Sequence, residues 1–561
     1  MTIRIGNMSG FYGDRFAAMR EMLTGGPLDV LTGDYLAELT MLILGRQRMK
    51  DPAGGYARTF LRQLEECLGL AIERGVRIVT NAGGLNPAGL AAEITALADR
   101  LGLSVRVAHV EGDNLLPRAA ELGLTGALTA NAYLGGWGIA ECLRAGADVV
   151  VTGRVTDASL VVGPAAAHFG WARTDFAQLA GATVAGHVIE CGAQATGGNY
   201  AFFTELADPT RIGFPIAEID ADGSCVITKH PGTGGAVTVE TVTAQLLYEI
   251  AGPDYLGPDV TTRFNTIQLA PDGPDRVRIT GVQGDAPPAT LKVCLNTLAG
   301  FRNSATFVLC GLDIDAKAEL ARRQLEAELG ADGITWTLAR TDHADADTEE
   351  TASAFLHAHI QTPDARRAKG FSRACVELAL ASYPGFTLTA PPADGTPVGV
   401  YRPEYVAADA VPQTAVLPSG ERVDVPHSET VAYRSTLAIV WDDEVEPLPP
   451  GPTRRVPLGA FLGARSGDKG GDANLGVWAR EDAGFRWLYH ELTVDRLREL
   501  LPEAKELEIE RHPLPNLRAV NFVLHGLLGL GVAASTRFDP QAKALGEWLR
   551  SRVVDVPEVV L

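Results

Sequence analysis

The sequence has few of the features that mark disulfide-rich, metal-binding or membrane proteins. Its 561 residues include only 7 cysteines, none in a CxxC pair, so neither a disulfide framework nor a zinc or iron–sulfur site is indicated. No apolar run reaches the roughly 20 residues of a membrane span. The first residues lack the basic and apolar segments of a signal peptide. We therefore expect a cytoplasmic protein with reduced thiols.

Positive charge is also scarce. Lys and Arg together number 49 against 69 Asp and Glu, which gives a formal net charge of −20. A surface of this sign repels phosphate backbones and anionic lipids, so we expect no nucleic-acid partner and no membrane partner. A small anionic ligand remains compatible with the charge, because the field inside one site is local.

Glycine, by contrast, is abundant, at 61 of 561 residues against a typical share of ~7%. Residues 1–200 alternate short apolar segments, such as 76–80, 104–108 and 148–152, with helical segments, such as 59–74 and 88–101. Strands separated by helices predict βαβ units and a mostly parallel sheet. We therefore assign this region to the α/β class.

The rest of the chain has a different pattern. Residues 201–445 combine expected hairpins, at 215–228 and 264–280, with helices at about 240–250, 315–329 and 365–382, which indicates an α+β region. The proline-rich residues 446–455 are typical of a linker. Residues 456–561 then predict four strands and two helices, which fit a small separate α+β domain.

Glycine-rich polar loops follow the predicted strands, and ligands of an open parallel sheet bind beyond the carboxyl ends of its strands. The loops cover residues 6–14, 32–35, 81–87, 111–114, 152–157 and 190–199. In loop 81–87, Gly83 and Gly84 allow close backbone approach to a ligand, and Asn81 offers a polar side chain. Asn86 followed by Pro87 begins a helix whose free N–H groups suit a carboxylate or phosphate. An ordinary capped turn is the alternative.

Two neighbouring loops carry further candidate substrate-binding residues. Ser9 lies in loop 6–14, which has neither the GxGxxG nor the GxxxxGK[ST] pattern of nucleotide sites. A plain glycine turn before a helix is an equally suitable interpretation of this loop. Asp34 stands with Glu38 at a predicted helix start, where acidic residues also suit the helix dipole.

Arg154 and Asp157 follow the most strand-like segment of the chain. Arg154 can bind a carboxylate or phosphate through two hydrogen bonds. Asp157 is a candidate catalytic acid or base, and a structural ion pair with Arg154 is the alternative.

Three further candidate catalytic residues lie in later loops. Glu190 and Cys191 place an acid beside a thiol, although a lone cysteine is more often a small buried residue. His230 follows a predicted strand and suits proton transfer, and the adjacent Lys229 suits an anionic group. A tight turn with an exposed histidine is the alternative for this segment.

Arg465, Asp468 and Lys469 fall within residues 464–474, which join two predicted strands. We interpret this stretch as too long and too charged for a minimal hairpin. Its glycines and cations predict a backbone nest that binds an anion, and an exposed hairpin loop is the alternative.

No cofactor is required by the sequence, and no residue is assigned as a metal ligand. The carboxylates of Asp34, Glu111, Asp113 and Asp157 make a Mg²⁺ site conceivable, but they share no fixed spacing.

Together these loops resemble the acyclic terpene utilisation protein A (AtuA) family. The matching segments are residues 5–14, 34–38, 81–87, 131–135, 152–157, 190–194 and 229–235. Residues 465–474 resemble the C-terminal ferredoxin-fold-like domain of that family, which occurs fused or as a separate small partner. The resemblance covers nearly the whole chain, and implies an AtuA-like core over 1–445.

The resemblance implies a role in the catabolism of terpenoid or branched-chain carboxylates through CoA thioesters. It suggests a lyase that releases acetate from a branched 3-hydroxyglutaryl-CoA-type intermediate, or a hydratase of an enoyl-CoA. The substrate would then be an acyl-CoA or a related small carboxylate, and we expect the chain to form a homo-oligomer.

Both reactions need a stabilised enolate-like charge beside the thioester carbonyl and a proton-transfer group. We expect the backbone N–H groups of Gly83 and Gly84 to stabilise the charge. The candidates for proton transfer are Asp157, Glu190 and His230, and those for holding a substrate anion are Arg154 and Lys469. The alternatives are a hydrolase that uses Cys191 or a metal-bound water, and a non-catalytic partner subunit of an acyl-CoA enzyme.

Overall fold

A computed structural model describes residues 2–432 and 445–561 of the chain. They form two compact units. The first unit comprises Met1–Asn296, Tyr401–Val532 and Asp539–Leu561, and the second comprises Thr297–Val400 and Ala533–Phe538. The first unit therefore contains both the predicted parallel sheet and the C-terminal domain.

The first unit is built on a sheet whose five central strands are parallel neighbours. In spatial order these strands are β1 (Ile3–Asn7), β2 (Val30–Gly33), β3 (Arg77–Thr80), β6 (Val149–Thr152) and β4 (Val107–Glu111). The parallel sheet predicted for the N-terminal region is confirmed. The strand predicted at 104–108 begins later, at Val107.

Antiparallel strands extend the sheet at both edges. Beside β1 lie β7 (Pro215–Ile219), β8 (Cys225–Lys229), β12 (Arg276–Thr280) and β11 (Gln268–Pro271), and beside β4 lie β19 (Thr414–Val416) and β20 (Arg422–Asp424). Residues predicted to form an α+β region thus continue the same sheet, which crosses the expected boundary at residue 200. Residues Phe264–Thr266, predicted as strand, form a 3-10 turn instead.

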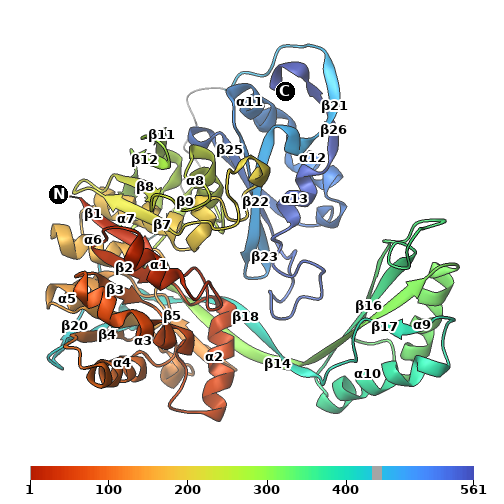
Figure 1. The fold of residues 1–561 in the computed structure, drawn as a ribbon, viewed down its shortest axis with the longest axis horizontal. Helices are drawn as coiled ribbons and strands as arrows, with labels where there is room; N and C mark the ends of the chain where they lie inside the picture. The colour runs from red at the N-terminus through yellow and green to blue at the C-terminus, as the bar shows by residue number, and fades with distance from the viewer. Residues whose placement is uncertain (1, 433–444) are drawn as a thin grey trace. The chain divides into compact units, whose positions relative to one another are not determined.

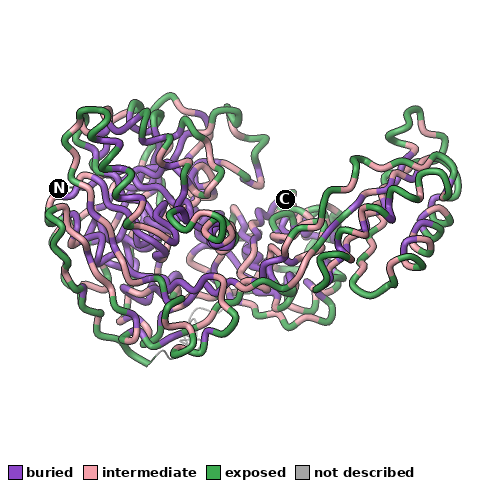
Figure 2. Tube along the Cα trace, turned by 90° about the horizontal axis from the view of Figure 1, so that it is seen from below, coloured by how far each residue is buried: buried purple, intermediate pink, exposed green. Residues whose placement is uncertain are grey.

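Helices cover both faces of the central strands (Figure 1). Buried side chains alternate along β6, so Val150 packs into one hydrophobic cluster while Val149 and Val151 pack into the other. The helices on the Val149 face are α1 (Ala18–Gly25), α3 (Arg58–Glu73) and α4 (Pro87–Leu101), and those on the Val150 face are α5 (Trp137–Arg144), α6 (Ser159–Phe169) and α7 (Phe176–Ile189). Figure 2 shows the buried segments concentrated on these inner strands.

The second unit is a smaller sheet with helices. Its strands are β15 (Ile334–Ala339), β16 (Ser353–Thr362) and the part of β14 (Thr290–Cys310) that follows Asn296, and its helices are α9 (Ile314–Leu329) and α10 (Ala365–Glu377). Phe307, Leu325 and Phe371 are fully buried in its core. The helix predicted at 315–329 is confirmed, and the one predicted at 365–382 ends earlier, at Glu377.

The C-terminal domain contains a four-stranded antiparallel sheet. Its spatial order is β22 (Leu462–Lys469), β23 (Asp472–Ala479), β25 (Ala519–Leu524) and β24 (Ile509–Leu514). The domain has its own core, covered by α11 (Asp482–Glu491), α12 (Val494–Leu500) and α13 (Leu545–Arg550). Four of its buried residues, Trp478, Leu514, Leu517 and Ala519, belong instead to the hydrophobic cluster of the parallel sheet.

Two predictions for this part of the chain are wrong. The expected loop at 464–474 is a tight hairpin, because Lys469 pairs with Asp472 and only Gly470 and Gly471 form the turn. The expected linker at 446–455 is partly a strand, β21 (Thr453–Pro457), which pairs with β26 (Val553–Pro557). The same unit contains α11, which the sequence analysis missed.

None of the described helices is both long enough and apolar enough to cross a membrane.

Candidate functional site

The ends of β2, β3 and β6 bring together four predicted residues. Asn81 donates a hydrogen bond from Nδ2 to Asp34 Oδ1 at 2.6 Å. Arg154, whose side chain is only 2% exposed, forms an ion pair with Asp157. The three strands are parallel, so their carboxyl ends lie at one edge of the sheet, and the predicted convergence of these loops is observed.

Arg154 is held on several sides. Its guanidinium lies 4.2 Å from the centre of the Tyr133 ring and donates a hydrogen bond to the carbonyl oxygen of Leu36 at 3.3 Å. The buried Asp113 accepts hydrogen bonds from the main-chain N–H of Arg154 at 2.9 Å and from Asn131 Nδ2 at 2.7 Å. Burial raises the pKa of Asp113 to about 6. Asp113 thus positions the β6 loop.

Glu38 is the most strongly ionised carboxylate of this region. It accepts a hydrogen bond from the Tyr133 hydroxyl at 2.8 Å and lies 3.5 Å from Lys292 Nζ. Burial opposes its ionisation, but the attraction of Lys292 and Arg154 outweighs burial and lowers the pKa of Glu38 to about 2. Glu38 therefore stays negative and can hold cations but cannot donate a proton near neutral pH.

Asp34 and Glu190 have the opposite character. Burial, reinforced by the negative charge of Asp157, raises the pKa of both carboxyl groups well above the usual range. Glu190 follows α7, and Asn7 fixes this helix end by donating to the carbonyl oxygens of Ile189 and Glu190, at 2.7 and 2.9 Å. Each raised pKa favours a protonated carboxyl, which is the form that acts as a general acid.

His187 supports the neutral state of Glu190. Its Nδ1 lies 3.2 Å from Glu190 Oε1, and burial lowers the pKa of His187 to about 4. The imidazole is therefore uncharged near neutral pH and gives Glu190 no positive partner there. Glu190 Oε2 is buried without a hydrogen-bond partner, so it can form a hydrogen bond with a ligand or a water molecule.

The environment of Cys191 does not favour a nucleophilic thiolate. Burial, together with the negative charges of Glu190 and Glu249, raises the pKa of the thiol well above its ordinary value. The nucleophile is the thiolate, so this surrounding opposes the chemistry proposed for Cys191. Ser9, in the facing loop, uses its hydroxyl to bind the carbonyl oxygen of Phe11 at 3.0 Å.

The β22–β23 hairpin adds charged groups from the C-terminal domain. Lys469 donates a hydrogen bond from Nζ to the carbonyl oxygen of Glu249 at 2.8 Å. Burial and the positive charge of Lys292 lower the pKa of Lys469 to about 8. Burial, with the charge of Glu249, raises the pKa of Asp468 to about 7. Arg465 stacks on the Tyr248 ring at 4.5 Å.

These groups form one electrostatically connected set. The charges of Glu38 and Glu190 act on Lys469, and those of Asp157 and Arg154 act on Glu190. We call this set the polar cluster; its members are Asp34, Glu38, Arg154, Asp157, Glu190, Lys292, Asp468 and Lys469. It combines fixed cations with carboxyl groups that can exchange protons near neutral pH.

Lys229 and His230 do not join the polar cluster. Lys229 binds the carbonyl oxygen of Thr233 at 2.7 Å and lies 3.0 Å from Asp275. His230 is 2% exposed, and its Nε2 lies 2.9 Å from the carbonyl oxygen of Met22 at α1. Both side chains hold the turn after β8 in place, so the proton-transfer role expected of His230 lacks a structural basis.

Loop 81–87 also differs from expectation. Asn86 accepts from the Gly89 N–H at 3.0 Å and caps α4, as the sequence predicts. The Gly84 N–H, expected to stabilise an enolate, donates instead to the carbonyl oxygen of Asn81 at 3.1 Å. A side chain at Gly83 would collide with the main chain of Thr152. These glycines serve contacts within the protein, so the capped turn is the correct interpretation here.

The carboxylates considered for Mg²⁺ do not converge. Glu111 pairs with Arg422 at 2.6 Å and with His109 at 3.0 Å. Within residues 2–432 and 445–561, no group of three or more His, Cys, Asp or Glu side chains is arranged to hold a metal ion.

Two residues of the site escaped the sequence analysis. Lys292 lies on the face of β14 opposite the apolar Leu291 and Val293, and a lone cation in a largely buried strand is a usable signal. Glu249 follows α8 (Val239–Leu246) in a segment with no motif, so only the tertiary structure reveals it.

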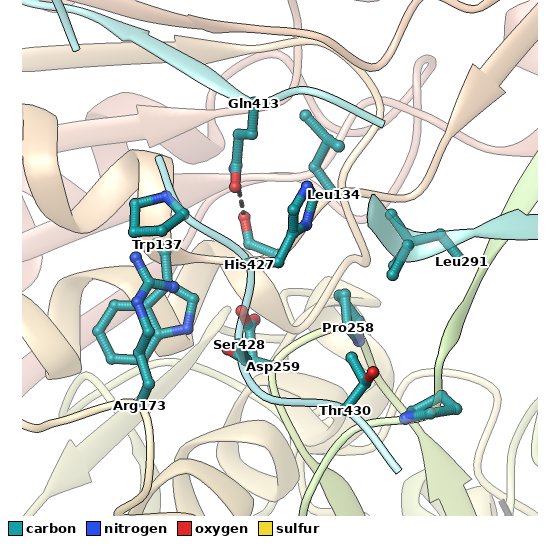
Figure 3. Close-up of a pocket in the computed structure, with 14 residues that line it drawn as sticks. Leu134, Trp137, Arg173, Pro258, Asp259, Leu291, Gln413, His427, Ser428 and Thr430 are labelled. Atoms are coloured by element: carbon teal, nitrogen blue, oxygen red, sulfur yellow. Dashed lines mark hydrogen bonds between the residues drawn. The ribbon is translucent and has the colours of Figure 1, made fainter. Parts of the chain in front are cut away.

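A small pocket lies among other residues of the first unit (Figure 3). It is lined in part by Trp137, Arg173, Asp259 and His427, and by no charged residue of the polar cluster. The Asp259 carboxylate already has partners within the protein, because it accepts hydrogen bonds from the Gly136 N–H at 2.8 Å and from Ser159 Oγ at 3.2 Å.

Two regions of the chain match known family models. Residues 3–417 match the model of the acyclic terpene utilisation family protein AtuA. The chain belongs to the AtuA family. Residues 456–555 match the AtuA ferredoxin-like domain, so the polar cluster includes residues from both family regions. Searches of curated proteins and of solved structures found no match to the chain.

Proposed function

We propose that this AtuA-family chain is a lyase or hydratase that acts on the CoA thioester of a terpenoid or other branched carboxylic acid. Membership of the family implies involvement in acyclic terpene utilisation. Both the thioester class and the reaction class come from the resemblance of the sequence to that family, and the polar cluster supplies groups that suit this chemistry.

The observation that carries the proposal is the gathering of Arg154, Lys292 and Lys469 beside carboxyl groups whose pKa is raised by burial. Breaking or forming a bond beside a thioester carbonyl places negative charge on an enolate-like group, which preorganised cations stabilise. Arg154 and Lys469 supply positive charge, and the raised pKa values of Asp34 and Glu190 make these residues proton donors. The cations take over the role expected of the Gly83 and Gly84 N–H groups.

In the lyase reaction, Arg154 would bind a substrate carboxylate, and a carboxyl group of the cluster would protonate the carbon released by C–C cleavage. In the hydratase reaction, the same carboxyl group would deliver a proton to the α-carbon while a base activates water. Asp157 is partly exposed, at 26% of its side chain, and is the candidate that a substrate reaches most easily. The lyase and hydratase reactions give different products but use the same residues to bind the substrate anion and to transfer the proton.

Ligand binding and product analysis test the proposal together. The protein is screened by thermal shift against CoA, short acyl-CoAs, hydroxy acids and divalent cations, because a ligand that binds only the folded state must raise the melting temperature. Acyl-CoAs that bind are then incubated with the protein, and mass spectrometry separates C–C cleavage, seen as a two-carbon product (acetate or acetyl-CoA), from gain or loss of water. We expect a stabilising acyl-CoA and one of these products.

Matched lysine variants locate the binding site. Lys469→Met removes a cation of the polar cluster, whereas Lys229→Met removes a buried lysine with a similar carbonyl bond outside it. The ligand-induced shift should fall in Lys469→Met and persist in Lys229→Met. Failure of every CoA species to raise the melting temperature of the wild-type protein would contradict the substrate class.

A further inference from the structure

Glu249 has an unusual backbone conformation. Its φ is 56°, in the left-handed region that a non-glycine residue adopts only at an energetic cost. Such strain persists where the surrounding structure imposes it, and it is concentrated at functional positions. The segment that contains Glu249 follows α8 and joins the parallel-sheet region to the surface of the C-terminal domain.

The C-terminal domain holds this segment through several hydrogen bonds. Asn474 Oδ1 accepts from the Glu249 N–H at 2.8 Å, and Lys469 Nζ donates to the Glu249 carbonyl oxygen at 2.8 Å. Asn521 donates from Nδ2 to the carbonyl oxygen of Ala251 at 2.9 Å. Both asparagines are fully buried and are hydrogen-bonded to each other. Two buried side chains thus fix the conformation of this strained loop.

The Glu249 side chain acts on the polar cluster. Its negative charge contributes to the raised pKa of Glu190, of Asp468 and of the Cys191 thiol, and it acts on Lys469 in the opposite sense to burial. These four residues form two adjacent pairs, residues 190–191 and 468–469, in distant segments of the chain. The hydrogen bond from Lys469 Nζ to the Glu249 carbonyl oxygen, at 2.8 Å, places Glu249 next to the polar cluster.

We propose that Glu249 is a further acid–base residue of the polar cluster and that Asn474 and Asn521 are its positioning residues. The inference rests on the proposed function, because it assigns a role within the same site. It also gives the ferredoxin-like domain a specific task, since the domain supplies Lys469 and fixes the backbone that carries Glu249.

In the lyase reaction, Glu249 takes the proton of the substrate's 3-hydroxyl group. The O–H electron pair forms the new C=O bond, the adjacent C–C bond breaks, and its electron pair passes to the α-carbon. Glu190 then gives its proton to that carbon. One proton is taken up and one is released, so the cluster ends with the same net charge and needs no other reactant.

The variant Glu249→Gln tests this role, because it removes the charge and keeps the main-chain hydrogen bonds. Glu240→Gln is the matched control: Glu240 lies on α8, and its charge acts on Tyr200 and Arg480 instead. We expect a loss of turnover of roughly 100-fold or more in Glu249→Gln and none in Glu240→Gln. A Glu249→Gln variant with wild-type turnover would overturn the catalytic assignment.

A second measurement reports the position of Glu249 without any activity. The rate of Cys191 alkylation is followed against pH by peptide mass spectrometry in each full-length variant. Loss of the Glu249 charge lowers the pKa of the thiol, so the midpoint should move to lower pH in Glu249→Gln and stay unchanged in Glu240→Gln. An unchanged midpoint in Glu249→Gln would contradict the placement.

Asn474→Ala tests the positioning role. If Asn474 only stabilised the fold, the variant would melt earlier and keep the wild-type midpoint; we expect instead a midpoint moved toward that of Glu249→Gln, with kcat reduced more than KM is raised. An unchanged midpoint would overturn the positioning role. If the wild-type protein turns over no thioester, the proposed function fails and the catalytic role with it, while the alkylation midpoints still decide the placement.

Discussion

The loops after β2, β3 and β6 and the turn after β8 are similar in sequence, since both are rich in glycine and carry charged or polar side chains. In the turn after β8, Lys229 and His230 each bind a main-chain carbonyl oxygen of the protein. Around Arg154, by contrast, several charged side chains act on one another electrostatically and shift one another's pKa values.

A polar group that is satisfied by the protein stabilises the fold, as Lys229 Nζ and His230 Nε2 do through their bonds to main-chain carbonyl oxygens. Buried atoms without a partner occur in both regions, Glu190 Oε2 and Arg154 Nε in one and His230 Nδ1 in the other. The contrast therefore rests on the charges gathered around Arg154. The following substitutions test the contrast between the two regions.

The largest effect is expected from Arg154→Met. The guanidinium is 2% exposed and pairs with Asp157, and its charge also acts on Glu38, so its removal leaves Asp157 without its ion-pair partner and Glu38 with Lys292 alone. Breaking a buried ion pair in this way costs about 3–5 kcal/mol of unfolding free energy. Urea unfolding measures the loss, and Lys229→Met, whose partner Asp275 is half-exposed, should lose clearly less. Equal losses of unfolding free energy in Arg154→Met and Lys229→Met would contradict the difference between the two regions.

Asp157→Asn should reduce turnover of the thioester by roughly 100-fold and should also lower the melting temperature, because the buried Arg154 guanidinium loses its ion-pair partner. Steady-state kinetics and thermal unfolding measure the two quantities. Asp275→Asn makes the same change beside Lys229 and should leave kcat unchanged. Full turnover in Asp157→Asn would remove that residue from the mechanism.

The stability of the protein should depend on pH through Asp468. Folding raises the pKa of this carboxyl from its ordinary 3.8 to about 7, so the folded chain binds the proton more tightly than the unfolded chain. Stability from this group is full below the unfolded pKa and is lost as the pH rises through about 7. The unfolding free energy of wild type, relative to Asp468→Asn, should fall between about pH 4 and about pH 7. A flat difference would show that Asp468 titrates normally.

The smallest effect is expected from His230→Asn. The variant loses the contact to the Met22 carbonyl oxygen, worth about 1 kcal/mol, and should keep wild-type kcat. Kinetics and urea unfolding measured on the same preparation check both statements. A large fall in kcat at unchanged stability would return His230 to the catalytic residues and weaken the comparison of the two regions.

The parallel sheet and the gathering of Asp34, Asn81 and Arg154 could be predicted because both follow from local rules. Short apolar segments separated by helices indicate parallel strands, and polar residues that end such strands share one edge. Asn86 was predictable as a helix cap for the same reason, since capping depends on a few neighbouring residues.

The C-terminal hairpin was not predictable, because its glycines serve a distant contact. Gly467 lies within β22, where a Cβ would approach the Tyr248 ring to 2.5 Å, so the residue allows the strand to pack on the parallel-sheet region. From the sequence, glycines beside charges favour a loop. Glu249 was missed for a related reason: its conformation is imposed by Asn474, more than two hundred positions away.

Deuterium exchange at the α-carbon of a bound thioester is the most direct test that the polar cluster performs proton transfer beside a thioester carbonyl. A stabilising acyl-CoA is incubated in D₂O with wild type, with Glu190→Gln and with the control Glu240→Gln, and is analysed by mass spectrometry. We predict incorporation of deuterium by wild type and Glu240→Gln and its loss in Glu190→Gln. A thioester that binds wild type but gains no deuterium, or equal gain in all three proteins, would contradict this assignment.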